Sequence, residues 1–390
     1  MAKGRIINFE WMRDYNHYSA EDFNLLRTRL VNREIDLAAE DGCDTIIGIY
    51  LLDGFLQPKA DLKNFILHMH AVKDHALSKG IENIYIVSGQ GEMIEGLPFP
   101  YFFFDYNVRM IYNSYRHTAL PQFNPNNDKF LFLTGMPDRP NRIGLMSKFY
   151  DAKMLDRAEW TFFPPWTDAD SNWCREHLSN YTDTEYKKFL KDCKRSYDGR
   201  YETAAPFYGS YTSGNTDVVW HDIVETDWVK APAHINSSVY ENTLFSIVSE
   251  GPNYWADDNA FATEKSWRVF LHKHPFIFAG NPDQFKYLKD LGYRTFEEYL
   301  PIPHYHAIDD ENKRLDAVVE NTRYLLEHRE HDDAIRMDTE HNYDVFFNHV
   351  AAQDKLLERF KNEFGVPEEE IEYYFEGVGY TQLIRRLPND

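Results

Sequence analysis

Strand-like and helix-like segments alternate in the first third of the chain. Apolar runs at residues 45–52 and 83–87 are separated by a helical pattern at 60–77, and a third apolar run follows at 101–105. A strand, a helix and a second strand predict a βαβ unit with parallel strands and a right-handed crossover. The sequence therefore predicts an N-terminal Rossmann-like domain.

The limits of this domain follow from the segments around it. The first forty residues are mostly helical in pattern, with a helix start at Ser19. A segment rich in Pro and Asn at residues 119–129 predicts a linker. We therefore predict a first domain over residues 1–127, a second over 128–321 and a helical extension over 322–390.

The second domain repeats the alternation of strands and helices. Strands are predicted at residues 130–133, 243–248 and 275–279, and helices at 143–150, from 263 onward and at 283–291. α/β layers of this kind bind ligands at the carboxyl ends of their strands. The ligand site of the second domain should therefore lie in the loops that follow its strands.

Four side chains fall at that edge: Glu250, Thr263, Glu264 and Lys265. A carboxylate accepts hydrogen bonds from the hydroxyls of a ribose, and a Lys beside the free N–H groups of a helix start suits a diphosphate. The alternative interpretation is that Thr263 and Glu264 only cap the helix beside a solvated Lys265.

The segment around these residues resembles the donor-binding segment of GT-B glycosyltransferases. The phrases SEG, FATEKSW, PFIFAG and LKDLGYRTF are similar to those of fucosyltransferase-like families and of related proteins encoded by large viruses and phages. The likeness extends over about sixty residues, which makes it more specific than a single short motif. It implies an α/β GT-B fold, with two Rossmann-like domains facing across a cleft and C-terminal helices, and a nucleotide-sugar as donor.

Arg139 and Arg142 lie between the strand at 130–133 and the helix after it. The forked guanidinium group matches phosphate oxygens two at a time. The stretch FLFLTGMPDRPNRIGL also resembles the viral proteins, in which an R-P-x-R phrase stands between strand and helix. We expect both arginines to bind the phosphates of the donor, although without the resemblance they would be interpreted as surface charges.

The chemistry of sugar transfer assigns the remaining roles. Arg139, Arg142 and Lys265 would stabilise the departing diphosphate without a metal ion. An inverting reaction also needs a general base, and its position favours a strand end in the first domain. Asp53 and Glu92 are preferred as catalytic candidates over Asp105.

The charge of the chain bears on the acceptor. A formal net charge of −21 weighs against a broad basic face for nucleic acid, although one local cleft would remain compatible with DNA. The resemblance to phage proteins suggests a hydroxymethylated DNA base as acceptor, whereas the charge favours a glycan or a small molecule. Two alternatives remain: a noncatalytic GT-B-like protein that binds nucleotide-sugars, and a hydrolase or epimerase on the same scaffold.

Other sequence features predict a cytoplasmic protein without a metal site. The opening residues contain no apolar run of signal-peptide length, and no window reaches the roughly 20 apolar residues of a membrane span. The three cysteines have no paired spacing. Asp168 and Asp170 form a D-x-D triplet, but it follows two prolines instead of an apolar strand, so we expect no metal and no cofactor besides the donor. The oligomeric state stays open.

Overall fold

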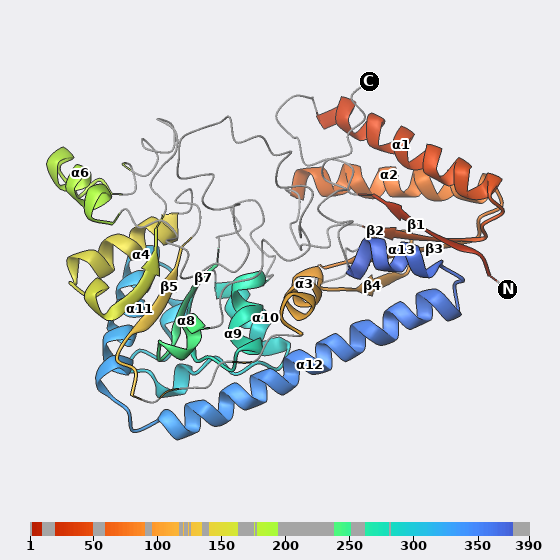
Figure 1. Cartoon of the computed structure of the whole chain (residues 1–390). Coiled ribbons are helices and arrows are strands. Elements are labelled where there is room, and N and C mark those ends of the chain that lie inside the picture. The colour runs from red at the N-terminus through yellow and green to blue at the C-terminus, as the bar shows by residue number, and fades with distance from the viewer. Residues whose placement is uncertain are drawn as a thin grey trace, which may run out of the picture. The chain divides into compact units, whose positions relative to one another are not determined.

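The computed structural model describes two compact α/β units. It describes residues 2–9, 20–49, 59–89, 96–116, 126–134, 140–162, 178–193, 238–250, 262–280 and 282–376, together with Leu120, Asn124 and Arg175. Among these residues, the first unit takes those up to 113 and those from 348 onward, and the second unit takes the rest. The chain therefore begins in the first unit, builds the second and returns to the first (Figure 1).

The first unit contains a parallel sheet in the order β1-β2-β3-β4. The strands are β1 (Gly4–Asn8), β2 (Thr45–Ile49), β3 (Asn83–Ser88) and β4 (Tyr101–Phe103), and the helices beside them are α1 (Ala20–Glu40), α2 (Lys59–Ser78) and α3 (Tyr106–Tyr115). Successive side chains of a strand point to opposite faces, so the neighbours Ile46 and Ile47 enter different cores. The sheet is thus covered on both faces, as parallel sheets require.

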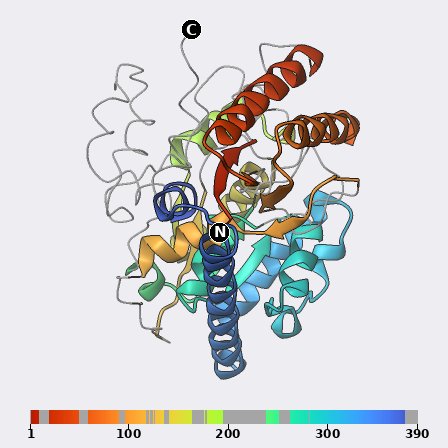
Figure 2. The same ribbon diagram turned by 90° about the vertical axis from the view of Figure 1, so that its right-hand side faces the viewer.

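Different parts of the chain cover the two faces. Helices α1 and α2 lie side by side on one face (Figures 1 and 2). On the other face, the end of α12 (Asp332–Asn362), α13 (Glu368–Ile371) and the π-helical turn Glu372–Glu376 pack against β1, β2 and β3. Leu357, Phe360 and Phe375 are the large C-terminal side chains of that core.

The C-terminal segment also covers the free edge of β1. The Gly4 N–H donates to the Gly365 carbonyl at 3.2 Å, and the Ile6 N–H donates to a carboxylate oxygen of Glu370 at 2.7 Å. A Cβ at Gly365 would lie 1.9 Å from the Ala2 carbonyl oxygen, and its φ of +65° is one that glycine adopts without strain. An edge strand that would otherwise expose unpaired backbone groups is therefore paired within the chain.

The second unit contains a parallel sheet in the order β6-β5-β7-β8. Its strands are β5 (Phe130–Leu133), β6 (Ala158–Thr161), β7 (Ser246–Ser249) and β8 (Phe276–Ala279). Its helical elements are α4 (Pro140–Asp151), η1 (Leu155–Arg157), α6 (Asp183–Asp192), α8 (Ser238–Glu241), α9 (Glu264–Leu271), α10 (Pro282–Asp290), η3 (Glu297–Tyr299), η4 (Tyr305–Ala307), α11 (Glu311–Glu327) and the first half of α12.

The strand order of this sheet creates a topological switch point. From β5 the chain crosses to β6 on one side, and from β7 it crosses to β8 on the other side. Right-handed crossovers then place α4 and α9 on opposite faces. On the α4 face, α11 crosses close by, since a Cβ at Gly144 would lie 2.9 Å from a methyl carbon of Leu315. The switch point therefore lies between β5 and β7, below the N-termini of α4 and α9.

The structure confirms a mixed α/β chain with two parallel sheets, which is compatible with two Rossmann-like domains. Helix α6 begins with a capping box that Thr182 and Glu185 form. The helix expected after Ser19 is present as α1, whereas residues 4–8 form β1 and not a helix. Five residues including Arg5 are too few to show a period, and β1 depends on pairing with distant segments.

The C-terminal helices are divided between the units. Residues 322–347 belong to the second unit and those from 348 onward to the first, so the segment predicted as one helical extension is shared. None of the described helices has the length and apolar character needed to cross a membrane.

Candidate functional site

Glu250 is the buried centre of the carboxyl edge of the second sheet. It directly follows β7 and has no exposed surface. Its Oε1 accepts hydrogen bonds from the Thr263 N–H at 3.0 Å and from the Ser266 hydroxyl at 2.8 Å, and its Oε2 accepts one from the Thr263 hydroxyl at 2.5 Å. The carboxylate of Glu250 therefore fixes the N-terminus of α9 to the end of β7.

Asn141 fixes the N-terminus of α4 to the same point. Its Nδ2 donates to the backbone carbonyl of Glu250 at 2.6 Å, and at longer distances to the Ala279 carbonyl at 3.3 Å and Ser249 Oγ at 3.5 Å. Ala279 ends β8, so this amide joins the ends of two strands to α4. Through Glu250, the N-termini of α4 and α9 converge at the switch point.

The N-termini of α4 and α9 differ in how their first backbone N–H groups are bound. At α9, the Thr263 hydroxyl lies 3.5 Å from the Lys265 N–H, and the Thr263 N–H is bound by Glu250. At α4, Pro140 has no N–H, and the next residues belong to the first turn, whose N–H groups have no partner within a helix. The partial positive charge at the start of α4 is therefore better placed to hold an anion than that of α9.

Four ionised side chains surround the start of α9. Lys265 Nζ lies 2.7 Å from Glu264, 3.1 Å from the Thr263 hydroxyl and 4.0 Å from Glu250, and an Arg268 nitrogen lies 3.7 Å from Glu264. Burial alone would raise the pKa of Glu264, but the charges of Lys265 and Arg268 and the hydrogen bond from Lys265 outweigh it and lower the pKa to about 2. The two carboxylates and two cations balance one another.

α4 adds a third cation to this edge of the sheet. Arg142 lies in its first turn and is 7% exposed. A small cavity opens between β5 and β7 on the side of α9, lined among others by Ser249, Lys265 and Arg268. Cations, a helix N-terminus and a hollow at a switch point are the elements with which α/β layers hold a phosphate.

The structure brings some of the predicted site residues together, whereas others lie outside the described residues. Glu250, Thr263, Glu264 and Lys265 are brought together with one another, and α4 brings Arg142 to the same edge of the sheet. Arg139, Asp53, Glu92, Asp168 and Asp170 lie outside the described residues. Asp105 caps α3, where its carboxylate accepts the Val108 N–H at 3.2 Å.

Two residues of this edge were not predicted from the sequence as site residues. Arg268 follows Glu264 by four residues, which is the spacing of an ion pair on one helix face and was a usable signal. Asn141 gave no such signal, because its contacts are with β7 and β8, more than one hundred residues away along the chain.

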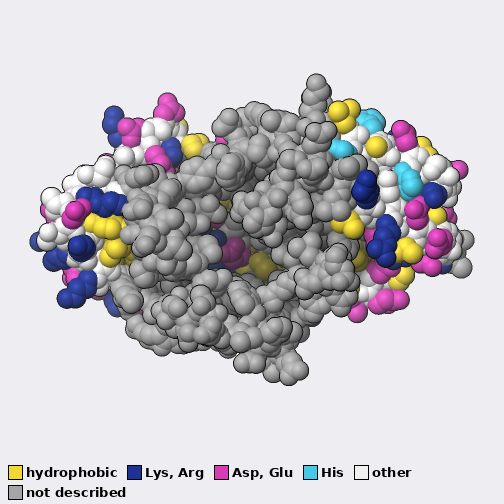
Figure 3. Space-filling view, turned by 90° about the horizontal axis from the view of Figure 1, so that it is seen from above, with side chains coloured by type: hydrophobic (Ala, Val, Ile, Leu, Met, Phe, Trp, Pro, Cys, Tyr) yellow, Lys and Arg dark blue, Asp and Glu magenta, His cyan; other side chains and the backbone are white. Residues whose placement is uncertain are grey.

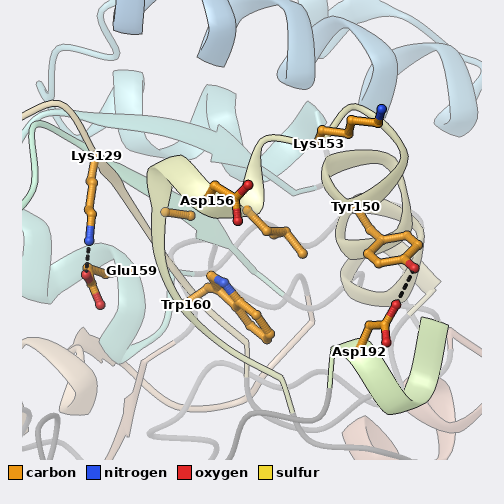
Figure 4. Close-up of a pocket in the computed structure, with 9 residues that line it drawn as sticks. Lys129, Tyr150, Lys153, Asp156, Glu159, Trp160 and Asp192 are labelled. Atoms are coloured by element: carbon orange, nitrogen blue, oxygen red, sulfur yellow. Dashed lines mark hydrogen bonds and ion pairs between the residues drawn. The ribbon is translucent and has the colours of Figure 1, made fainter. Parts of the chain in front are cut away.

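Two larger cavities lie away from the switch point. One of about 540 Å³ flanks the amino half of β6 and the last turn of α4 (Figure 4). Two pairs of its polar groups are bonded to each other, Lys129 with Glu159 at 2.7 Å and the Tyr150 hydroxyl with Asp192 at 2.7 Å, and Lys153 and Asp156 also line it. The other, of about 470 Å³, lies at the amino ends of β7 and β8 and is lined by Tyr240, His272 and His274 among others.

Acidic and basic side chains are intermixed over the described surface seen in Figure 3. That view shows no broad basic face on the described residues, which agrees with the net charge of −21. Among the described residues, no three His, Cys, Asp or Glu side chains are grouped so that they would hold a metal ion.

His274 makes stability depend on pH. It is buried, with Nδ1 2.9 Å from the Ser246 hydroxyl, and burial lowers its pKa to about 4. Because the unfolded chain takes up this proton at about pH 6.5, stability should fall as the pH drops from 6.5 to 4, by up to about 3 kcal/mol. Urea unfolding at pH 7, 6, 5 and 4 should show a weaker decline for His274→Gln than for the wild type. His70→Gln is the control, because His70 is exposed. If the stability of His274→Gln declined as much as that of the wild type, this assignment would be refuted.

Comparison of the chain with models of protein families, with curated proteins and with solved structures finds no match.

Proposed function

We propose that this protein is a glycosyltransferase of the GT-B type that binds a nucleoside diphosphate sugar at the carboxyl edge of its second sheet. The observation that supports this most is the convergence of the α4 and α9 N-termini on Glu250 at the switch point. Doubly wound α/β layers hold nucleotides at this position. The sequence likeness to GT-B donor segments covers the same residues.

In this proposal the two helix N-termini have different roles. The first turn of α4, with Arg142 and the neighbouring Arg139, would hold the diphosphate. Lys265 would face it from α9 and shift part of its contact from Glu264 to phosphate oxygens. Glu264 would stay compensated by Arg268, which lies 3.7 Å away. Glu250 and Thr263 would position α9.

The proposed reaction moves the sugar from the diphosphate to a hydroxyl. The bond between the anomeric carbon and the phosphate oxygen breaks, a bond from that carbon to the acceptor oxygen forms, and the acceptor proton passes to a general base. The charge left on the diphosphate would be stabilised by the fixed cations and the α4 N-terminus. Asp53 and Glu92 stay the candidates for the base, and a hydroxymethylated DNA base, a glycan or a small molecule the candidates for the acceptor.

Nucleotide binding tests the proposal directly. UDP, GDP, ADP and CMP are compared by thermal shift, since a ligand stabilises the state that binds it. We expect a shift with at least one of them, and a roughly 10-fold or greater loss of affinity in Lys265→Ala, because charge-assisted hydrogen bonds contribute about 1.5–3 kcal/mol.

Lys148→Ala is the matched control for this substitution. Lys148 lies in the last turn of α4, at the opposite end from the proposed site, and pairs with Asp316. Affinity in this variant should stay unchanged. The proposal is overturned if no nucleotide stabilises the protein, or if Lys148→Ala weakens binding as much as Lys265→Ala.

A further inference from the structure

We propose that Asn141 and Ser249 together recognise a hydroxyl group of the bound nucleotide-sugar, an inference that rests on the proposed function. Both side chains are almost fully buried at the switch point, with exposures of 4% and 1%. Asn141 lies in the first turn of α4, and Ser249 ends β7. They are close together, with Asn141 Nδ2 3.5 Å from Ser249 Oγ.

The orientation of the Asn141 amide is fixed by its surroundings. The atom nearest the Glu250 and Ala279 carbonyls, at 2.6 Å and 3.3 Å, must be a donor, because a carbonyl oxygen only accepts. The other atom, Oδ1, is therefore an acceptor. It is buried and receives no hydrogen bond from the part of the chain that the structure describes. A buried polar atom without a partner is uncommon in native proteins and calls for a specific explanation.

Ser249 has an unused donor, whereas Asn141 has an unused acceptor. The oxygen of Ser249 is approached by the Asn141 amide, but its own hydroxyl hydrogen finds no acceptor among the described residues. The same serine lines the small cavity between β5 and β7 together with Lys265 and Arg268. Among the described residues, the switch point thus offers one unused donor, on Ser249 at the cavity, and one unused acceptor on Asn141, whose Nδ2 lies 3.5 Å from Ser249 Oγ.

A hydroxyl group satisfies both atoms at once, since it donates one hydrogen bond and accepts others. A phosphate oxygen only accepts, so it would leave Asn141 Oδ1 unsatisfied. Glu250, one of the two carboxylates considered from sequence as ribose ligands, already accepts three hydrogen bonds from Thr263 and Ser266. We therefore assign recognition of a sugar hydroxyl to the amide oxygen of Asn141 and not to the carboxylate of Glu250.

The test compares nucleotides that differ by one hydroxyl. The affinity of the best-binding nucleoside diphosphate is measured by calorimetry beside its 2′-deoxy and 3′-deoxy analogues, and its sugar conjugate beside the 2-deoxysugar conjugate. The first comparison probes the ribose, and the second comparison probes the transferred sugar. The wild type should prefer one hydroxylated ligand by about 10-fold.

Ser249→Ala should bring this preference to within about 2-fold while leaving the Asn141 clamp on Glu250 and Ala279 in place. Ser147→Ala is the matched control, because this buried serine of α4 does not line that cavity and its hydroxyl donates to the Gly144 carbonyl at 2.8 Å. It should keep the full preference. The inference is overturned if the wild type ignores every hydroxyl tested, or if Ser249→Ala keeps the preference. If the wild type bound none of the nucleotides, the proposed function would be overturned, and this inference with it.

Discussion

Deleting residues 348–390 should leave the first unit without a stable fold. Together with Tyr106 and Met110 of α3, the C-terminal segment covers one face of its sheet, and Phe360, with no exposed surface, packs there among Ile47 and Val87. The same deletion removes Gly365 and Glu370 from the edge of β1. An uncovered apolar face and an unpaired edge strand together favour aggregation.

Limited proteolysis and gel filtration would measure this effect. The shortened chain should be cleaved rapidly within residues 2–113, while the second unit, which keeps α11 and the first half of α12, resists. Met337→Ser serves as control because Met337 is 69% exposed on α12, and it should behave as the wild type. A shortened chain that stays monomeric and protected over residues 2–113 would contradict the assigned role of the C-terminal segment.

Glu250→Ala should have the largest effect of any single substitution at the proposed site. It removes three hydrogen bonds to α9 and leaves Thr263, Ser266 and Lys265 without their shared carboxylate. Loss of a buried, hydrogen-bonded carboxylate costs about 3–5 kcal/mol. Since α9 would lose its attachment to β7, nucleotide binding should be lost as well.

A matched series separates this positioning role from simple loss of charge. Glu250→Gln keeps the shape and one acceptor, so it should lose less stability than Glu250→Ala in denaturant unfolding. Glu264→Ala removes a carboxylate next to Lys265 that is 23% exposed, and it should destabilise less than either. If Glu264→Ala destabilised the protein more than Glu250→Ala, the central place given to Glu250 would be wrong.

Local patterns were sufficient to predict much of the second unit. The apolar strand before Glu250, the cap at Thr263 and the strand at 275–279 each have a clear signal within ten residues, and all are present. The capping box of α6 is likewise local, because Thr182 and Glu185 are only three residues apart. Where hydrogen bonds and apolar periods are local, the sequence predicts the element directly.

The features that sequence reasoning missed depend on distant contacts. β1 is held by β2 on one side and by residues 365 and 370 on the other, so its own five residues carry little information. The sequence could not tell whether Glu250 or Glu264 would bind ribose, because a loop carboxylate looks alike whether it faces a ligand or a helix cap. Only the distances to Thr263 and Ser266 distinguish these roles.

A crystal structure with the best-binding nucleoside diphosphate would test the central claim most directly. The account predicts that the diphosphate lies over the first turn of α4 with oxygens within about 3 Å of its N–H groups and of Lys265 Nζ. It would be contradicted by a nucleotide bound at the amino edge of the sheet, for instance in the cavity beside Tyr240 and His274.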